Sequence, residues 1–281
     1  MNILHAILLG FIQGLTEFLP ISSSGHLALM QKLFHIDIGS GVLFDVLLHF
    51  GTLVSICIVF RKDVALLVKE FCGMVADVFR KFRDPYVIII SSSYRKFVLM
   101  IIVSTIPTGI LGIVAKDFVE YAAGSLLIIG ICLIITAIVL FLADMAGDGR
   151  KGAKSATYLN AFEIGMAQGV ATMPGISRSG ATLATCLLCG FKREFAVKYS
   201  FLMSIPAVLG AVVLELKDLE KGDFTGGMIL NSVVGMIVAG AVGYVALKVM
   251  IAVVKNKKYI IFSVYCFVVG IIAIIANFFI K

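Results

Sequence analysis

Gln13-Gly-Leu-Thr-Glu17-Phe-Leu-Pro20-Ile-Ser22-Ser23-Ser24-Gly25-His26 interrupts an apolar segment of membrane length. It places a carboxylate, three serine hydroxyls and an imidazole at a depth where ionisable groups usually mark a functional site. Proline and the serines after it are poor helix interior, so the helix that begins near Ile3 must break here. Unpaired backbone groups are tolerated at membrane depth only inside protein or beside a wet cavity. The break therefore predicts a re-entrant pair of short helices around a site, with residues 26–34 as the returning arm.

A second copy of this stretch lies 155 positions further along the chain and shares seven of sixteen positions with the first. The identical pairs are Gly10 and Gly165, Gln13 and Gln168, Gly14 and Gly169, Ile21 and Ile176, Ser22 and Ser177, Ser24 and Ser179, and Gly25 and Gly180. The chemically different pairs are Glu17 and Thr172, Ser23 and Arg178, and His26 and Ala181. A guanidinium suits phosphate oxygens, whereas a carboxylate and an imidazole suit metal binding or proton transfer. We interpret the two copies as halves of one phosphate-handling site.

The composition indicates a polytopic membrane protein. Of the 281 residues, 60% are hydrophobic and only 15% are charged, and the mean hydropathy is +1.06. A water-soluble core could not bury that much apolar surface. The net charge of +7 does not indicate nucleic-acid binding, because the basic residues lie in short connections between apolar runs. The six cysteines lie mostly within apolar runs, so we expect small buried residues rather than disulfides.

Six further apolar runs are long enough to span a membrane: residues 41–60, 97–115, 125–143, 196–214, 226–253 and 259–280. Residues 159–191 repeat the opening design, with a break at Pro174-Gly175. The predicted fold is an all-α integral membrane protein of six transmembrane helices plus two re-entrant helix pairs. Within the polar interlude of residues 61–96, we expect residues 64–79 to form an interfacial helix.

We divide the chain into a first repeat (1–145), a linker (146–158) and a second repeat (159–281). Each repeat holds one re-entrant pair and three spans, so the second must enter from the opposite side and the topology is inverted. In this topology, sixteen Lys and Arg residues lie in connections on one side of the membrane and five lie on the other side. The positive-inside rule makes the richer side cytoplasmic, so the Glu17 half-site opens outward.

Asp45 and His49 lie four residues apart in the first span and therefore share one helical face, which we expect to look inward. This face either forms a second wall of the polar cavity or makes a hydrogen bond that packs neighbouring helices.

Arg178 also allows two interpretations. With Ser177, Ser179 and Thr182 it suits a phosphate or pyrophosphate group, but it could also serve as a structural ion pair with Glu17.

Two motifs carry a resemblance to a known family. The chain has Gln13-Gly-Leu-Thr-Glu17, leading into the serines and His26, and Pro174-Gly-Ile-Ser-Arg-Ser-Gly-Ala-Thr182. It resembles, essentially from end to end, the bacterial undecaprenyl pyrophosphate phosphatases, also called bacitracin-resistance proteins. Some members of that family have a glutamate where this chain has Gln13, so a mechanism that needs two carboxylates from this motif is in question here.

The resemblance implies hydrolysis of a polyprenyl pyrophosphate, undecaprenyl pyrophosphate, to the monophosphate and inorganic phosphate. The reaction would take place at the outer face of the bacterial plasma membrane, in the lipid bilayer, assisted by Mg²⁺ or Ca²⁺. It would recycle the lipid carrier for peptidoglycan synthesis and confer bacitracin resistance, since bacitracin sequesters the substrate. No nucleic-acid partner is expected, and a homodimer is compatible with the sequence.

The expected roles follow from the chemistry of phosphoryl transfer. Arg178 should hold the transferring phosphoryl group, and Glu17 should bind the divalent ion or act as general base. Ser23 is the preferred nucleophile, and His26 is the alternative, either as nucleophile or as acid for the leaving group. Phosphate oxygens should be bound by Ser22, Ser24, Ser177, Arg178, Ser179 and Thr182. Secondary roles fall to Gln13 and His49.

The competing function is a membrane transporter or flippase of a polyprenyl phosphate lipid. The inverted repeat by itself favours transport, because secondary transporters commonly have this design. The convergence of a carboxylate, hydroxyls, an imidazole and a guanidinium favours hydrolysis.

Overall fold

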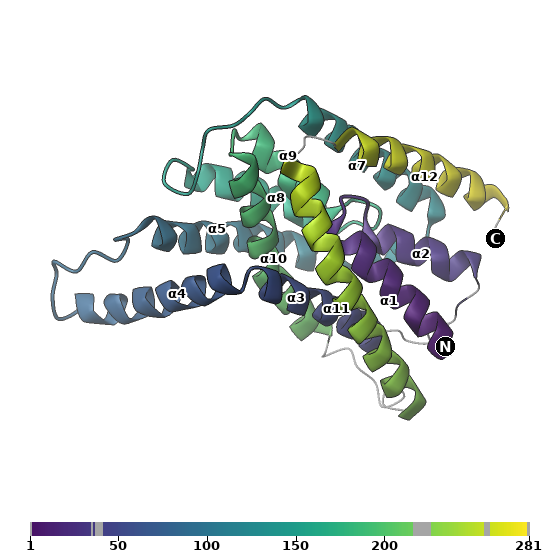
Figure 1. Cartoon of the computed structure of the whole chain (residues 1–281), viewed down its shortest axis with the longest axis horizontal. Coiled ribbons are helices and arrows are strands. Elements are labelled where there is room, and N and C mark those ends of the chain that lie inside the picture. The colour runs from purple at the N-terminus through teal and green to yellow at the C-terminus, as the bar shows by residue number, and fades with distance from the viewer. Residues whose placement is uncertain (1, 35, 37–41, 216–225, 256–258, 280–281) are drawn as a thin grey trace.

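The computed structural model describes residues 2–34, 36, 42–215, 226–255 and 259–279 (Figure 1). Regular structure in these ranges is α-helical apart from one isolated bridge between Lys151 and Phe191. The helices are α1 (Ile3–Phe18), α2 (Ser23–Leu33), α3 (Val42–Val59), α4 (Arg61–Lys81), α5 (Ser93–Val114), α6 (Lys116–Ala123), α7 (Leu126–Met145), α8 (Tyr158–Val170), α9 (Arg178–Leu188), α10 (Arg193–Glu215), α11 (Gly226–Lys255) and α12 (Tyr259–Phe279).

Both predicted breaks are confirmed. The first apolar run ends at Phe18, shortly before Pro20, and α2 then begins at Ser23. The returning arm starts three residues earlier than predicted, because the side chain of Ser22 caps the new helix. The second run breaks in the same way between α8 and α9. Each break thus leaves two short helices joined by a tight loop.

Five helices, α5, α7, α10, α11 and α12, are long and apolar enough to cross a membrane. Helix α3 makes a sixth candidate when it is counted with α4, from which it is bent by 90°. The described part of the chain is therefore an all-α membrane protein with five or six candidate spans. The interfacial helix predicted over residues 64–79 is part of a longer helix, α4, which runs beside α5 and reaches past the other helices at the left of Figure 1. The eight-residue α6 was not predicted.

The helices approach one another closely at small residues. Helix α1 packs on α11, where a Cβ added at Gly10 would lie 2.5 Å from the carbonyl oxygen of Gly235. Helix α8 packs on α5, where a Cβ at Gly165 would overlap the backbone of Ser104. Small residues permit such contacts, and membrane helices depend on them because lipid supplies no hydrophobic driving force between helices.

Hydroxyl groups add hydrogen bonds across these interfaces. Thr108 of α5 donates to the carbonyl oxygen of Gly165 at 2.9 Å, and Ser55 of α3 donates to that of Gly240 on α11 at 2.6 Å. Both hydroxyls are buried. The first bond attaches α8, an arm of the second broken segment, to α5, and the second bond joins α3 to α11.

The linker between the proposed repeats is attached to the turn that joins α9 and α10. Lys151 donates its backbone N–H to the Gly190 carbonyl at 3.0 Å, and Lys192 donates to the Lys151 carbonyl at 2.9 Å. The division of the chain at residues 146–158 stays a prediction. All six cysteines are free, as expected, and three of them, Cys132, Cys186 and Cys266, are buried.

Replacement of Gly165 by alanine should destabilise the protein, because the new methyl group meets rigid backbone of α5. Overpacking of this kind costs about 1–3 kcal/mol. The matched control is Gly109→Ala on α5, where an added Cβ meets nothing within 4 Å. Thermal unfolding in detergent, followed by circular dichroism, should show a lower Tm for the Gly165 variant only. Equal Tm values for the two variants would contradict the close packing of α8 on α5.

Candidate active site

The first loop presents Ser22 and Ser23 at the start of α2. Ser22 has φ 70° and is the one residue other than glycine with positive φ in the described part of the chain. Its hydroxyl accepts the backbone N–H of Gly25 at 3.3 Å and so caps α2. Non-glycine residues rarely adopt this conformation, and in proteins it occurs mainly at functional sites.

The second loop is built in a similar way and is anchored by α7. Ser177 caps α9 by accepting the backbone N–H of Gly180 at 3.1 Å. The Thr136 hydroxyl on α7 donates to the Gly175 carbonyl at 3.0 Å and accepts the N–H of Ser177 at 3.0 Å. This one buried side chain fixes the loop on both sides of its turn, and so it fixes where Arg178 begins α9.

The two loops touch each other. A Cβ at Gly25 would lie 3.1 Å from Cα of Gly175, and one at Gly180 would lie 3.2 Å from Cβ of Pro20. The absence of side chains at these two glycines therefore allows the loops to approach closely. The hydroxyl of Ser179 also donates to the Leu19 carbonyl at 3.3 Å. Residues that are far apart in the sequence therefore form one site.

The carboxylate of Glu17 lies at the centre of this site. Its Oε1 accepts a hydrogen bond from Nη2 of Arg178, which pairs the two charges. Its Oε2 accepts from the Ser23 hydroxyl at 2.6 Å and from Nε2 of Gln13 at 3.1 Å. The side chain of Glu17 is 5% exposed and that of Arg178 is 26% exposed. An almost fully buried carboxylate is thus matched by a cation and two polar donors, as its burial requires.

A small cavity of about 10 Å³ lies beside this ion pair. Its lining residues are Glu17, Phe18, Ile56, Arg178, Ser179, Thr182, Ser200, Phe201 and Ser204. The Thr182 and Ser200 hydroxyls are 2.5 Å apart. Sequence reasoning missed Ser200 and Ser204, which are buried and one turn apart on α10. Their spacing of four residues within an apolar span was the only hint in the sequence.

His26 points toward α12. Its Nδ1 is 2.7 Å from the Ser22 carbonyl oxygen, and its Nε2 is 2.8 Å from the hydroxyl of Tyr265. The two rings are stacked, with centroids 5.6 Å apart and an interplanar angle of 7°. Tyr265 was not predicted, because it lies 239 residues away and belongs to neither motif.

Of the residues predicted for the site, Gln13, Glu17, Ser23, Arg178, Ser179 and Thr182 are brought together. Ser22 and Ser177 cap the two helices, while Ser24 is exposed and its hydroxyl lies 3.5 Å from that of Ser22. His49 bonds through Nδ1 to the Asp45 carbonyl at 2.9 Å, within its own helix. Neither residue is among those that line the small cavity beside Glu17.

A divalent cation would find few protein ligands at this site. Among the described residues, no group of three or more His, Cys, Asp or Glu side chains could hold a metal. Glu17 contributes the carboxylate that lines the small cavity, and the buried Oε1 of Gln13 has no hydrogen-bond partner. Mg²⁺ is commonly held by one or two carboxylates together with substrate phosphates and water. One carboxylate and one free amide oxygen fit a cation that arrives with a phosphate group.

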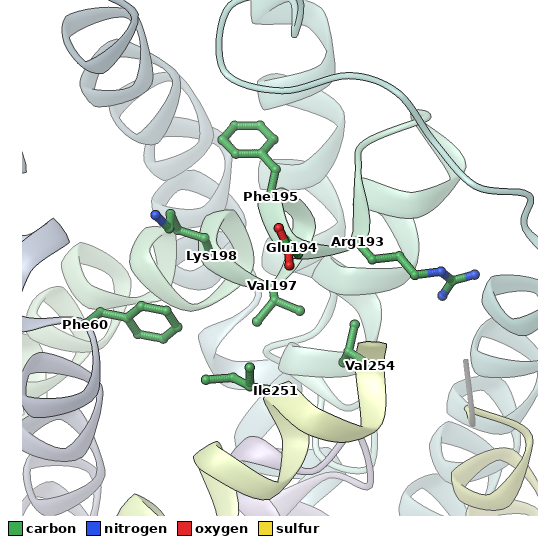
Figure 2. Close-up of a pocket in the computed structure, with 8 residues that line it drawn as sticks. All are labelled: Phe60, Arg193, Glu194, Phe195, Val197, Lys198, Ile251 and Val254. Carbon is green, nitrogen blue, oxygen red and sulfur yellow. The ribbon is translucent and has the colours of Figure 1, made fainter. Parts of the chain in front are cut away.

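A larger cavity of about 420 Å³ lies where α3, α10 and α11 meet (Figure 2). Its charged residues have other partners, since Arg193 bonds to Asp148 and Lys198 bonds to Asp63. Figure 2 shows the cationic groups of both side chains pointing away from one another. Phe60 on its wall stacks on Phe201 of the small cavity, with centroids 6.3 Å apart. This cavity therefore lacks the converging polar groups that surround Glu17.

Comparison with known proteins decides the family. The sequence model of the family described as bacitracin resistance protein BacA matches residues 6–272. The chain belongs to this family. It is 42% identical over 278 residues to an undecaprenyl-diphosphatase of Alkaliphilus metalliredigens, with 98% of each chain covered. It is 40% identical over 285 residues to one of Methanosphaera stadtmanae, with 99% of each covered. A relative from Carboxydothermus hydrogenoformans is 41% identical over 275 residues, with 96% of each covered.

The family match spans both loops, so the Glu17–Arg178 pair and its hydroxyl neighbours lie within the matched region. The expected resemblance is confirmed. The match also covers all of the candidate spans except the last residues of α12.

The burial of the ion pair predicts a characteristic pattern of stability. Glu17→Gln and Arg178→Gln should each lower the stability by about 2 kcal/mol or more, because each leaves one charge unpaired in a poorly solvated site. The double variant should be more stable than either single variant, since it buries no charge. Thermal unfolding of the four proteins in detergent measures this coupling. Strictly additive losses would show that the two side chains do not stabilise each other.

Proposed function

We propose that this chain is an undecaprenyl-diphosphatase, which hydrolyses undecaprenyl diphosphate to undecaprenyl phosphate and inorganic phosphate and supports bacitracin resistance. The observation that carries this proposal is the meeting of Arg178 with Glu17 and Ser23, which come from two different loops. The match to the family and to relatives of that name over nearly the whole chain supports it. A phosphate-binding cation beside a hydrogen-bonded serine and carboxylate is what phosphoryl transfer needs.

Ser23 is the proposed nucleophile and Glu17 its general base. The serine O–H already donates to Oε2 of Glu17 at 2.6 Å, so the proton has an acceptor in place. As the Oγ bonds to the terminal phosphorus, the bond from that phosphorus to the bridging oxygen breaks and the lipid monophosphate leaves. Water then hydrolyses the phosphoserine and releases inorganic phosphate. His26 is the less favoured nucleophile, because both of its ring nitrogens are hydrogen-bonded elsewhere.

Substrate binding should open the ion pair. The cavity of about 10 Å³ holds about one water molecule and is too small for a phosphate group. Arg178 would therefore turn from Glu17 to the phosphoryl oxygens, which its planar fork suits. The same movement frees Oε1 of Glu17 from the guanidinium, while Oε2 remains the acceptor of the Ser23 proton. Phosphate binding and the release of Oε1 are thus coupled through one side chain.

A divalent cation, Mg²⁺ or Ca²⁺, is proposed to enter with the substrate. Glu17 and the free Oε1 of Gln13 would hold it. When bound, the cation neutralises charge on the pyrophosphate. Gln13 replaces a second carboxylate in this role, since an amide oxygen can act as a ligand although it cannot act as a base.

We further propose that residues 1–145 and 159–281 are inverted repeats with the site facing outward. The packing of Gly10 on α11 and of Gly165 on α5 supports this, since these glycines are 155 positions apart and meet corresponding helices. The loop contacts obey the same relation: Gly25 meets Gly175, and Gly180 meets Pro20. An outward site in the plasma membrane follows from the Lys and Arg bias. The lipid tail would stay in the bilayer while its head group enters between the loops.

The second candidate function is transport of a polyprenyl phosphate lipid. It is favoured by the two cavities on either side of the Phe60–Phe201 pair. Transport gives no role to the hydrogen bond between Ser23 and Glu17, and we therefore rank transport second.

Purified protein should release inorganic phosphate from undecaprenyl diphosphate, and a chelator should reduce the rate. Ser23→Ala and Glu17→Gln should abolish most turnover.

Arg178→Lys keeps the positive charge but loses the planar fork of N–H donors, so activity should fall at least about tenfold, or ~1.4 kcal/mol. Phosphate release measured for each variant, with Gln13→Ala as a milder comparison, provides the test. Normal release by Arg178→Lys would reject the phosphate clamp, and lipid transfer in liposomes without release would favour transport.

The proposed orientation can be tested with the exposed Cys72 on α4. An impermeant maleimide should not label Cys72 in sealed cells and should label it once the cells are permeabilised. In a Cys72→Ser background, Phe34→Cys at the end of α2 should label in sealed cells, because Phe34 is exposed on the opposite side of the proposed topology. External labelling of Cys72 would overturn the orientation.

A further inference from the structure

The strained residue of the first loop is held by a chain of hydrogen bonds that leads to α12. The carbonyl oxygen of Ser22 can only accept a hydrogen bond, so Nδ1 of His26, 2.7 Å away, must carry the proton. In the neutral imidazole, Nε2 is then an acceptor, and it receives the hydroxyl of Tyr265 at 2.8 Å. The Ser22 carbonyl thus selects one tautomer of His26, and the Tyr265 hydroxyl holds the ring in place by donating to the remaining nitrogen.

This arrangement is absent from the corresponding part of the second loop. Ser177 occupies the position equivalent to Ser22 and has φ −73°, an ordinary value. Ala181 occupies the position equivalent to His26. Three features therefore occur together near the first loop, which carries the proposed nucleophile. They are the positive φ of the capping Ser22, the imidazole of His26 and the hydroxyl of Ser23. Strained backbone persists only where surrounding contacts hold it, and such contacts are often part of a mechanism.

Ser23 follows the strained residue directly, so the backbone at Ser22 determines where the Ser23 hydroxyl points. Relaxation of φ to a negative value would rotate Ser23 away from Oε2 of Glu17, to which it now donates at 2.6 Å. The Ser22 carbonyl accepts the backbone N–H of His26 at 3.2 Å and the imidazole at 2.7 Å, and because both residues are buried, no solvent replaces the second bond if the imidazole turns away.

We propose that Tyr265 is a positioning residue: through His26 it holds the strained Ser22 backbone, and it thereby aims Ser23 at Glu17. This inference rests on the proposed phosphatase function and assigns a task to Tyr265, which lies outside both sequence motifs. The imidazole of His26 acts on the backbone as a hydrogen-bond donor. Proton transfer to the substrate is not its task.

The first test is Tyr265→Phe. The ring keeps its stacking on His26 but loses the hydroxyl, so kcat should fall about fivefold, or ~1 kcal/mol, while KM stays unchanged. Tyr158→Phe is the matched control, since Tyr158 is exposed at the start of α8 and lies outside both motifs. A kcat for Tyr265→Phe equal to that of the control would overturn the proposal.

The second test separates a backbone clamp from acid–base chemistry at His26. His26→Asn can still donate from its amide to the Ser22 carbonyl, but it cannot transfer a proton at neutral pH or reach Tyr265. It should keep about a tenth or more of the wild-type kcat, whereas His26→Ala should lose about a hundredfold or more. In the His26→Asn background, Tyr265→Phe should have no further effect, because the two residues act through one path.

Folding of each variant is checked by its Tm, and only variants within a few degrees of wild type are compared. His26→Asn that folds normally and is as inactive as His26→Ala would reject the clamp in favour of proton transfer. If the wild-type protein releases no phosphate, the proposed function is rejected. The hydrogen bond from His26 to the Ser22 carbonyl is then tested by ¹⁵N NMR of the imidazole ring. A proton on Nδ1 supports this bond, and a proton on Nε2 overturns it.

Discussion

The ion pair between Glu17 and Arg178 is the interaction on which the rest of the structure depends. An isolated charge at this depth would cost many kcal/mol, so each side chain needs the other. Glu17 lies near the end of α1 and Arg178 begins α9, so their pairing joins the two broken segments at one point. The pair is also chemically exchangeable, because a phosphate group offers Arg178 the same kind of partner as a carboxylate. We propose that the interaction that stabilises this site is also the one that the substrate replaces.

Close backbone packing makes this pairing feasible. Two broken segments can meet inside a membrane only when their free backbone groups find partners within the protein. Here the serine caps and the Thr136 hydroxyl supply those partners, and the absence of side chains at Gly25 and Gly180 lets the loops approach each other. Larger side chains at the two glycines would separate the loops and with them the charges. The glycines shared by the two copies of the motif therefore serve the site as much as the fold.

Much of the architecture could be predicted from the sequence, because apolar length and prolines act locally. The two breaks and the candidate spans followed from such features, and the internal repeat indicated which residues would share a site. Three features of the site could not be predicted. Ser200 and Ser204 look like ordinary hydroxyls in an apolar helix until α10 is placed against Glu17. Tyr265 contacts His26 across 239 residues, and the positive φ of Ser22 is a conformation that serine rarely adopts, so the residue type gave no sign of it. The 90° bend between α3 and α4 likewise depends on packing rather than on a proline or glycine at the junction.

The central claim is that substrate phosphate takes the place of Glu17 as the partner of Arg178. The most direct test is a structure of the protein with a non-hydrolysable polyprenyl bisphosphonate bound. The predicted result is a terminal phosphonate held by the guanidinium of Arg178 beside Ser179 and Thr182, with its phosphorus in line with the Ser23 hydroxyl. An intact Glu17–Arg178 pair, with the bisphosphonate bound instead in the cavity beside Phe60, would contradict the account.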